Sequence, residues 1–283
     1  MNGGSSCFER SQPVLPVAEA VRPRLTNGEA GRRIFDAVAA GDIEAVEAMV
    51  RSDPKLLSTH RRLAEGERPA NGNAGDLLVF AVARCDARMV GALLELGADP
   101  DGTPAGLPLT LAALADDPLM ATMLLQAGAN ADAHTPDTST PLREALYFER
   151  SDAVELLIRG GADVNRADAV GGTPLEAALT FADYRSAEIL MRAGANPWQV
   201  ANKGTLPAAL LVSPAKEGGD EIIRQRLLEQ LRANAPSWPP PSATEVTRNV
   251  LAGSWPTPAM QERGFAVTEQ ALESMRRSAR AGR

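Results

Sequence analysis

The chain has 283 residues, of which 44% are hydrophobic and 23% charged, an ordinary balance for a soluble globular protein of one large or two small domains. Its formal net charge of −7 argues against nucleic acid as the main ligand, because phosphate binding needs a basic surface. No apolar run approaches the roughly 18 residues of a transmembrane helix, so we expect no membrane span.

The first segment, residues 1–30, begins with Gly and Ser and continues with several prolines, and we expect it to be disordered. It lacks a basic start followed by an apolar stretch, so we do not expect a secretory signal peptide. Cys7 lies in this segment and Cys85 in a helical pattern further on. Two isolated cysteines predict two free thiols in a reducing cytoplasm.

Residues 31–235 read as successive pairs of helices. The first pair, Arg33–Leu57, contains the amphipathic run Ile43–Val50 and looks like an N-terminal cap. The next pair, Leu77–Asp101, has its second helix over Met89–Leu96. These ends are weaker than the middle of the array, as expected of units with one face toward solvent.

An insertion separates these two pairs. Gly41 and Cys85 occupy equivalent positions but are farther apart than one period, so about eleven residues are extra within 53–75. This stretch contains Arg61 and Arg62. It is either a loop that contacts a partner or a tolerated surface loop, since long loops cost little.

Two marks recur in step through the middle of the chain. Gly-Ala-Asp or Gly-Ala-Asn begins at Gly97, Gly128, Gly161 and Gly194, and a proline recurs at Pro108, Pro141, Pro174 and Pro207. Threonine before proline can cap a helix, and proline suits its first turn. Glycine allows the left-handed conformation in which many helices end. Each period therefore predicts a helix that starts at the proline and a second that stops at the glycine.

These phrases resemble the ankyrin repeat. The resemblance implies a β-turn and two antiparallel helices per unit, stacked as an all-α solenoid of about six units with atypical caps. The histidine that usually follows Thr-Pro-Leu is Arg143 or Glu176 here. The glycine usual between the two helices is Asp116, Glu149 and Ala182 here, so we expect these turns to be less regular. Cys85 replaces the same glycine in the earlier unit.

The chain continues beyond the last repeat. A helix over Asp220–Arg232 looks like a C-terminal cap, and residues 236–242 form a Pro-rich linker. Residues 243–283 predict a basic tail with helices over Thr244–Leu251 and Thr268–Arg280. The tail either packs on the acidic array or docks elsewhere.

No catalytic constellation is visible. His60 and His134 lie far apart, no paired Cys-x-x-Cys occurs, and neither a phosphate-binding loop nor a nucleophile elbow is present. We therefore expect a protein that is not an enzyme and has no cofactor and no metal site.

The resemblance implies that a partner would bind the concave side, built from hairpin tips and first helices. Tyr147 is expected at the surface, whereas Phe148 and Phe181 either fill the seam between helices or face a partner. With the two arginines of the insertion, the candidate partner-binding residues are Arg61, Arg62, Arg143, Tyr147, Phe148, Glu176, Thr180, Phe181 and Tyr184.

The expected function is non-catalytic protein–protein interaction by a monomer. The acidic body predicts a partner with a basic or mixed surface. Arginine far exceeds lysine and alanine is abundant, a composition that indicates a GC-rich genome, and we expect a bacterial source. We expect the protein to act in the cytoplasm as an adaptor or an inhibitor. Two alternatives remain open: an exported effector that binds a host protein, and an autoinhibited scaffold whose basic tail covers its own groove.

Overall fold

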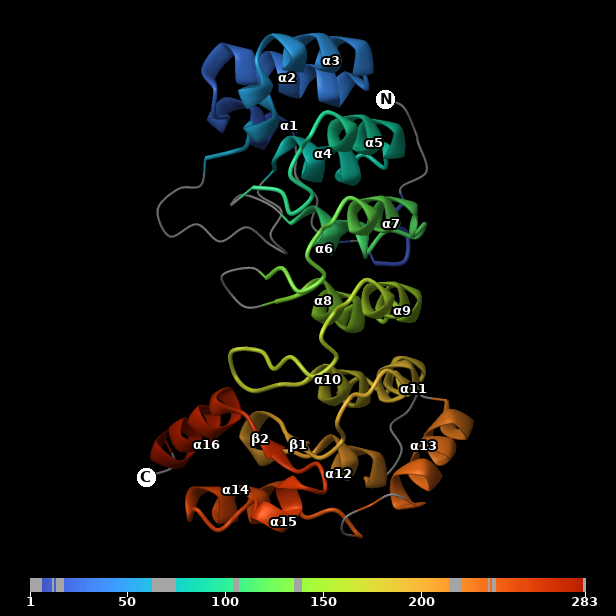
Figure 1. The fold of residues 1–283 in the computed structure, drawn as a ribbon, viewed down its shortest axis with the longest axis vertical. Helices are drawn as coiled ribbons and strands as arrows, with labels where there is room; N and C mark the ends of the chain where they lie inside the picture. Colours follow the sequence, from blue (N-terminus) through green and yellow to red (C-terminus); the bar gives the residue numbers. More distant parts are fainter. Residues whose placement is uncertain are drawn as a thin grey trace. The chain divides into compact units, whose positions relative to one another are not determined.

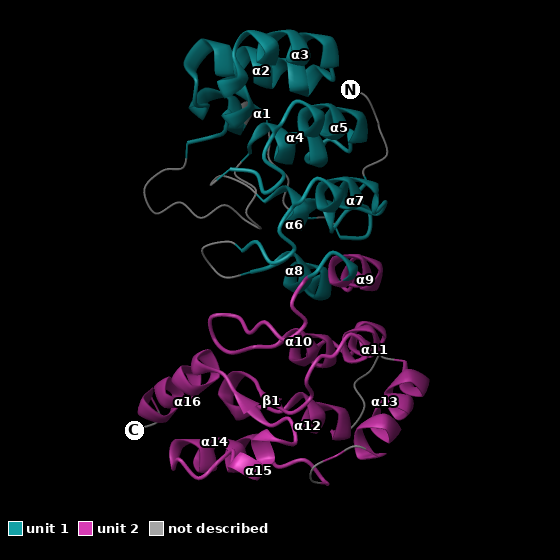
Figure 2. Ribbon diagram, viewed as in Figure 1, with its two compact units in different colours: residues 1–148, 159–161 teal, residues 149–158, 162–283 magenta. Residues whose placement is uncertain are grey.

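The fold is described from a computed structural model of the chain (Figure 1). It describes residues 7–11, 13, 18–62, 75–103, 107–134, 139–213, 220–233, 235 and 238–281. The chain divides into two compact units, each considered by itself (Figure 2). The first comprises residues 1–148 and 159–161, and the second comprises residues 149–158 and 162–283.

The first unit is built from pairs of helices. Its elements are α1 (Ala18–Val21), η1 (Arg22–Arg24), α2 (Gly28–Ala40), α3 (Ile43–Ser52), η2 (Pro54–Ser58), α4 (Leu77–Ala83), α5 (Ala87–Glu95), α6 (Pro108–Ala112), α7 (Leu119–Gln126) and α8 (Pro141–Tyr147). First helices pack in the order α2, α4, α6 and α8, and second helices in the order α3, α5 and α7. The predicted succession of helix pairs is confirmed here.

Capping residues fix where these helices begin. The Oδ1 atoms of Asp42 and Asp86 accept hydrogen bonds from backbone N–H groups at the starts of α3 and α5, each at 3.0 Å. Thr140 caps α8, with its Oγ1 3.3 Å from the backbone nitrogen of Arg143. Because the first N–H groups of a helix have no partner within it, these caps set the start of each helix.

The turns inside the helix pairs keep one backbone conformation although their residues differ. Gly41 has φ of 72°, and Cys85, Glu149 and Ala182 have φ of 59°, 54° and 60°. This left-handed region costs a non-glycine residue roughly 1–2 kcal/mol. The expectation of less regular turns is therefore wrong at Glu149 and Ala182, and Cys85 keeps the regular conformation as well. Asp116 does not share the left-handed conformation, and its turn alone among these four departs from the pattern.

Closely packed small and aliphatic side chains fill the core of each unit. In the first unit Leu93, Leu111 and Leu146 are fully buried, as are Leu157 and Leu190 in the second. Burying a leucine stabilises a fold by about 1.5–3 kcal/mol. Among helices of the described residues, none is both long enough and apolar enough to span a bilayer.

The second unit continues the helix pairs and adds the C-terminal segment. Its elements are α9 (Ser151–Arg159), α10 (Pro174–Thr180), α11 (Tyr184–Arg192), β1 (Gln199–Val200), η4 (Asn202–Gly204), α12 (Pro207–Val212), α13 (Glu221–Ala233), α14 (Ala243–Leu251), α15 (Pro258–Gln261), β2 (Ala266–Val267) and α16 (Glu269–Ala281). Helix α10 packs on α12, and α11 packs on α13. The helices expected over 220–232, 244–251 and 268–280 correspond to α13, α14 and α16.

The C-terminal segment folds onto the last helix pair. Strand β2 runs parallel to β1 over two residue pairs. Beside this pairing, the ring of Phe265 lies 5.1 Å from that of Trp198 and 4.9 Å from that of Trp255. Phe265 and Trp198 are buried, at 2% and 6% exposure. An apolar cluster therefore joins the tail to the hairpin before α12.

Helix α16 packs through its small and apolar side. Ala271 and Met275 are fully buried, and the Ser274 hydroxyl donates to Oδ1 of Asn202 at 2.7 Å. The arginines Arg276, Arg277 and Arg280 are exposed. Of the two alternatives for the tail, packing on the repeats is the one observed, and the side that makes the contact is apolar rather than basic.

The N-terminal segment differs from expectation. Cys7 and Cys85 form a disulfide, with a Cα–Cα distance of 5.8 Å, so the prediction of two free thiols is wrong. Residues 7–11 and 18–30 are described, and Phe8 and Val21 are buried at 1% and 2% exposure. For these residues the expectation of disorder is wrong as well. The remaining residues before Ala18 lie outside those described, apart from Pro13.

Candidate protein-binding surface

The end of α8 presents an exposed aromatic pair in the first unit. The helix buries Leu142, Ala145 and Leu146 in the core. Tyr147 follows them at the last helical position and is 63% exposed. Its ring meets the half-buried ring of Phe148 edge to face, with centroids 5.2 Å apart. The expectation of a surface position is met for Tyr147, and Phe148 is intermediate between the two alternatives.

Arg143 lies one turn before this pair on the same helix. It is half-buried, and its backbone N–H is used by the Thr140 cap. Residues four apart on a helix lie on one face, so Arg143 and Tyr147 are neighbours there. A cation beside a tyrosine and a phenylalanine is a combination common at protein interfaces. The end of α8 therefore offers the residue types that an interface uses.

Helix α10 presents the equivalent positions in the second unit. Thr180 ends the helix and is exposed, Phe181 follows it with 44% exposure, and Glu176 is half-buried. Tyr184, however, is buried at 5% exposure, so its assignment to a partner-binding surface is wrong. It is the first residue of α11, directly after the N-cap Asp183, and its ring belongs to the core.

The two arginines of the insertion lie at a different place in the first unit. The Arg61 N–H donates to the Gly75 carbonyl at 2.9 Å, and the Arg62 N–H donates to the Arg24 carbonyl at 2.8 Å. Arg61 is half-buried and Arg62 is exposed. The part of the insertion over 63–74 lies outside the described residues. The backbone of these two arginines is thus held by hydrogen bonds to other segments of the first unit.

A cavity of about 520 Å³ lies near this pairing and includes His60 and Asp76 in its lining. Asp76 is buried, and burial raises the pKa of its carboxyl above the ordinary value. Its Oδ1 accepts from the Val79 N–H at 2.6 Å, and its Oδ2 accepts from the Thr103 N–H at 2.9 Å. Both oxygens therefore hold local backbone, and Asp76 is a helix cap and loop anchor.

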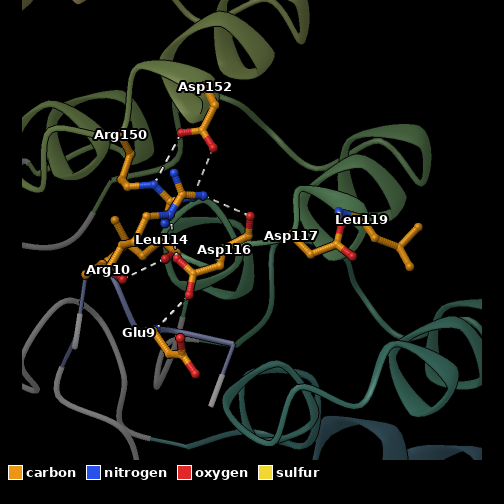
Figure 3. Close-up of polar contacts among 9 residues, drawn as sticks. Glu9, Arg10, Leu114, Asp116, Asp117, Leu119, Arg150 and Asp152 are labelled. Carbon is orange, nitrogen blue, oxygen red and sulfur yellow. Dashed lines mark hydrogen bonds and ion pairs between the residues drawn. The ribbon is translucent and has the colours of Figure 1, made fainter. Parts of the chain in front are cut away.

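Sequence reasoning missed a contact region in the first unit, the N-terminal strap, defined as residues 7–11. Figure 3 shows Glu9 and Arg10 converging on Asp116, whose Oδ2 accepts from the Glu9 N–H at 2.7 Å and whose Oδ1 accepts from Arg10 Nε at 2.9 Å. One feature of the sequence could have indicated this contact. Cys85 and Asp116 occupy turn positions where glycine is usual, and each has a reactive or charged side chain.

The same view contains an ion pair within the second unit. Arg150 is buried at 3% exposure, and its Nη2 lies 3.1 Å from Oδ2 of Asp152 (Figure 3). Asp152 lies in the first turn of α9, where a negative charge suits the positive end of the helix. This pair therefore lies at the start of α9.

Within the described part of the chain, no group of three or more His, Cys, Asp or Glu side chains is arranged to hold a metal ion. The predicted candidates do not gather at one point either. Arg143, Tyr147 and Phe148 share one helix end, and the insertion arginines lie between η2 and α4 of the first unit. Glu176, Thr180 and Phe181 belong to the second unit.

Comparison with known proteins bears on the middle of the chain. A search of curated proteins found no match. Residues 109–201 match the family model of ankyrin repeats in three copies. This range covers the helix pairs from α6 to α11, which have the all-α arrangement that such repeats require. Residues 109–201 are therefore ankyrin repeats, a kind of array that indicates a protein–protein interaction module.

Proposed function

We propose that the chain is a non-catalytic module that binds a partner protein at the end of α8. The proposal rests on the aromatic pair of Tyr147 and Phe148, in which Tyr147 is 63% exposed. Aromatics make up only 4% of the chain, and Phe35, Phe80 and Phe265 are buried. Exposed aromatic rings near a cation are typical anchors of interfaces.

Charge supports a partner with a basic or mixed surface. The net charge of −7 favours attraction to cationic surfaces, and it disfavours nucleic acid. We expect a monomer that associates with one protein partner. Complex formation should weaken as salt is raised, because exposed charges are screened.

A comparison of matched variants tests the site. Tagged full-length protein should retain a stoichiometric partner from a lysate of its source, and Tyr147→Ala with Phe148→Ala should lose it. Truncating interface anchors typically costs at least about 2 kcal/mol, or roughly thirtyfold in affinity. Leu119→Ala is the control, because Leu119 is 50% exposed in the same unit but lies on a second helix, α7. Equal loss in both variants would exclude the α8 end as the binding site.

The biological class is open between a cytoplasmic adaptor or inhibitor and an exported effector. The Cys7–Cys85 disulfide supports export, since disulfides persist mainly in oxidising compartments. Fractionation of the producing cell, with the cysteines alkylated at lysis, separates the two classes. Recovery outside the cytoplasm with the disulfide intact supports export, and recovery in the cytoplasm with both thiols alkylated supports the adaptor or inhibitor.

The autoinhibited scaffold receives less support than a structural role of the tail. Strand β2 pairs with β1, and Phe265 packs on Trp198, so the tail completes the last repeat in the manner of a cap. A cap stabilises the array without competing for a partner. Removal of residues 243–283 should lower the melting temperature and leave partner affinity no higher than before. An increase in affinity would favour autoinhibition.

A further inference from the structure

The N-terminal strap is linked covalently to a turn far from it in sequence. Cys7 and Cys85 are 78 residues apart, and the second lies in the turn between α4 and α5. We propose that this pair is an oxidation site built into the fold. The strap first binds through non-covalent contacts centred on Asp116, and a disulfide-containing oxidant then fastens it by thiol–disulfide exchange.

Asp116 holds the strap with its backbone and its side chain together. Its carboxylate accepts from the Glu9 N–H at 2.7 Å and from Arg10 Nε at 2.9 Å. Its own N–H donates to the Cys7 carbonyl at 2.6 Å, and its carbonyl accepts from Arg10 Nη2 at 3.1 Å. These contacts involve Cys7, Glu9 and Arg10, so they set the register of the strap; Figure 3 shows those of Glu9 and Arg10.

Two further contacts fix the strap on either side of this centre. The ring of Phe8 is 1% exposed, so the strap cannot lift away without moving an apolar ring into water. At the other end, the Ser11 hydroxyl donates to the Leu114 carbonyl at 2.6 Å. Together with Asp116, these contacts bring Cys7 to the α4–α5 turn before any covalent bond exists.

Cys85 occupies a position that favours glycine. Its φ of 59° places it in the left-handed region, where the equivalent turn residue in the first helix pair is Gly41. Glu149 and Ala182 share this conformation, so the repeated turn sets the backbone of Cys85. The Cys7 N–H points at Sγ of Cys85 over 3.0 Å. Cys85 therefore presents its sulfur to the strap from a turn whose backbone conformation recurs along the array.

The oxidation of the two cysteines proceeds through a mixed disulfide with the oxidant. One cysteine thiolate attacks the disulfide of the oxidant and releases one of its two sulfurs as a thiolate, which takes up a proton. The second cysteine thiolate then attacks the mixed disulfide and releases the other sulfur in the same way. Two electrons and two protons pass to the oxidant, which becomes two thiols. A dithiol reductant reverses the reaction and frees the strap.

The first experiment measures how fast the pair closes. Reduced full-length protein is exposed to oxidised glutathione, and free thiols are counted by alkylation and mass spectrometry. The wild type should close one intrachain disulfide. Asp116→Asn should close about fivefold more slowly, because the amide keeps one acceptor oxygen for two donors and loses the charge that pairs with Arg10 at a partly exposed site. Asp117→Asn is the matched control and should close at the wild-type rate, since it can still accept from the Leu119 N–H as Asp117 does.

The second experiment measures what the bond does. Hydrogen exchange at the backbone amides of Glu9 and Asp116, which take part in the strap contacts, is compared between oxidised protein, reduced protein and Cys7→Ser. Protection should be highest in the oxidised protein and lower, to a similar degree, in the other two. Absence of an intrachain disulfide in the first experiment, or equal closing rates for Asp116→Asn and the wild type, would overturn the proposal. So would equal protection in all three forms of a protein whose circular dichroism is unchanged.

Discussion

The two ends of the chain are attached to the helix pairs by different means. In the first unit the strap is short, and it is held by hydrogen bonds around Asp116, one buried ring and a disulfide. In the second unit the tail contributes helices, a strand pairing and an aromatic cluster around Phe265. The disulfide of the strap responds to redox state and its Asp116 hydrogen bonds respond to pH, whereas the buried apolar side chains of the tail respond to neither. We therefore expect redox state and pH to change the attachment of the strap and not that of the tail.

The largest expected effect concerns the aromatic cluster. Phe265→Ala should lower the free energy of unfolding by about 3–5 kcal/mol, because it opens a cavity between Trp198 and Trp255. Leu251→Ala in α14 is the control and should stay within about 1 kcal/mol, since Leu251 is 38% exposed. Chemical denaturation measures both. Similar values for the two variants would mean that the tail is not held by this cluster.

A pair of glycines tests how closely α16 packs. A Cβ on Gly171 would lie 2.6 Å from the Ala271 Cα, whereas a Cβ on Gly194 would meet nothing within 4 Å. Both glycines have positive φ, 87° and 94°. Gly194→Ala should therefore cost roughly 1–2 kcal/mol from the backbone alone, and Gly171→Ala roughly 1–3 kcal/mol more. Thermal unfolding distinguishes them, and equal losses would contradict the observed contact between α16 and the hairpin.

The smallest expected effect is the response of the strap to acid. Burial alone would raise the pKa of Asp116, but hydrogen bonds from the Arg10 side chain and from the backbone at Glu9 and Arg10 outweigh it and lower that pKa. The ionised Asp116 carboxylate therefore stabilises the strap contacts at pH values above 3.8, the ordinary pKa of the group. This stabilisation is lost as pH falls through the lowered pKa. In Cys7→Ser, where no covalent bond intervenes, strap contacts should therefore weaken below pH 3.8.

NMR signals of Phe8 in the Cys7→Ser background measure this transition. Adding Asp116→Asn removes the titrating group, so the doubly substituted protein should show weaker strap contacts and no acid step of its own. An acid step of equal size in both proteins would mean that another group controls the strap. The tail provides an internal reference, because the signals of Phe265 should not move in the same pH range.

Sequence patterns were sufficient for the parts of the fold that depend on neighbouring residues. Prolines at Pro108, Pro141 and Pro174 begin α6, α8 and α10, as their place in the first helical turn predicts. Glycines at Gly97 and Gly194 adopt the left-handed conformation expected after a second helix. Helices α14 and α16 were predicted from their own periodicity.

Features that depend on distant residues were not accessible in this way. The β1–β2 pairing joins two very short strands, and the strap meets a turn more than a hundred residues away at Asp116. Nothing in the local sequence around Cys7 indicates its partner. Tyr184 illustrates the same limit, because a tyrosine at the start of a helix can face either way and only the packing of α11 decides.

Photo-crosslinking tests directly whether the end of α8 contacts a partner. A photoreactive phenylalanine analogue is placed at Tyr147 in one protein and at Leu119 in another, and each is irradiated in the presence of the co-purified partner. Both positions are exposed, so reagent access is comparable. We expect a stoichiometric crosslink from position 147 and little from position 119. Crosslinks from position 119 alone would place the partner on α7 and exclude the end of α8 as the binding site.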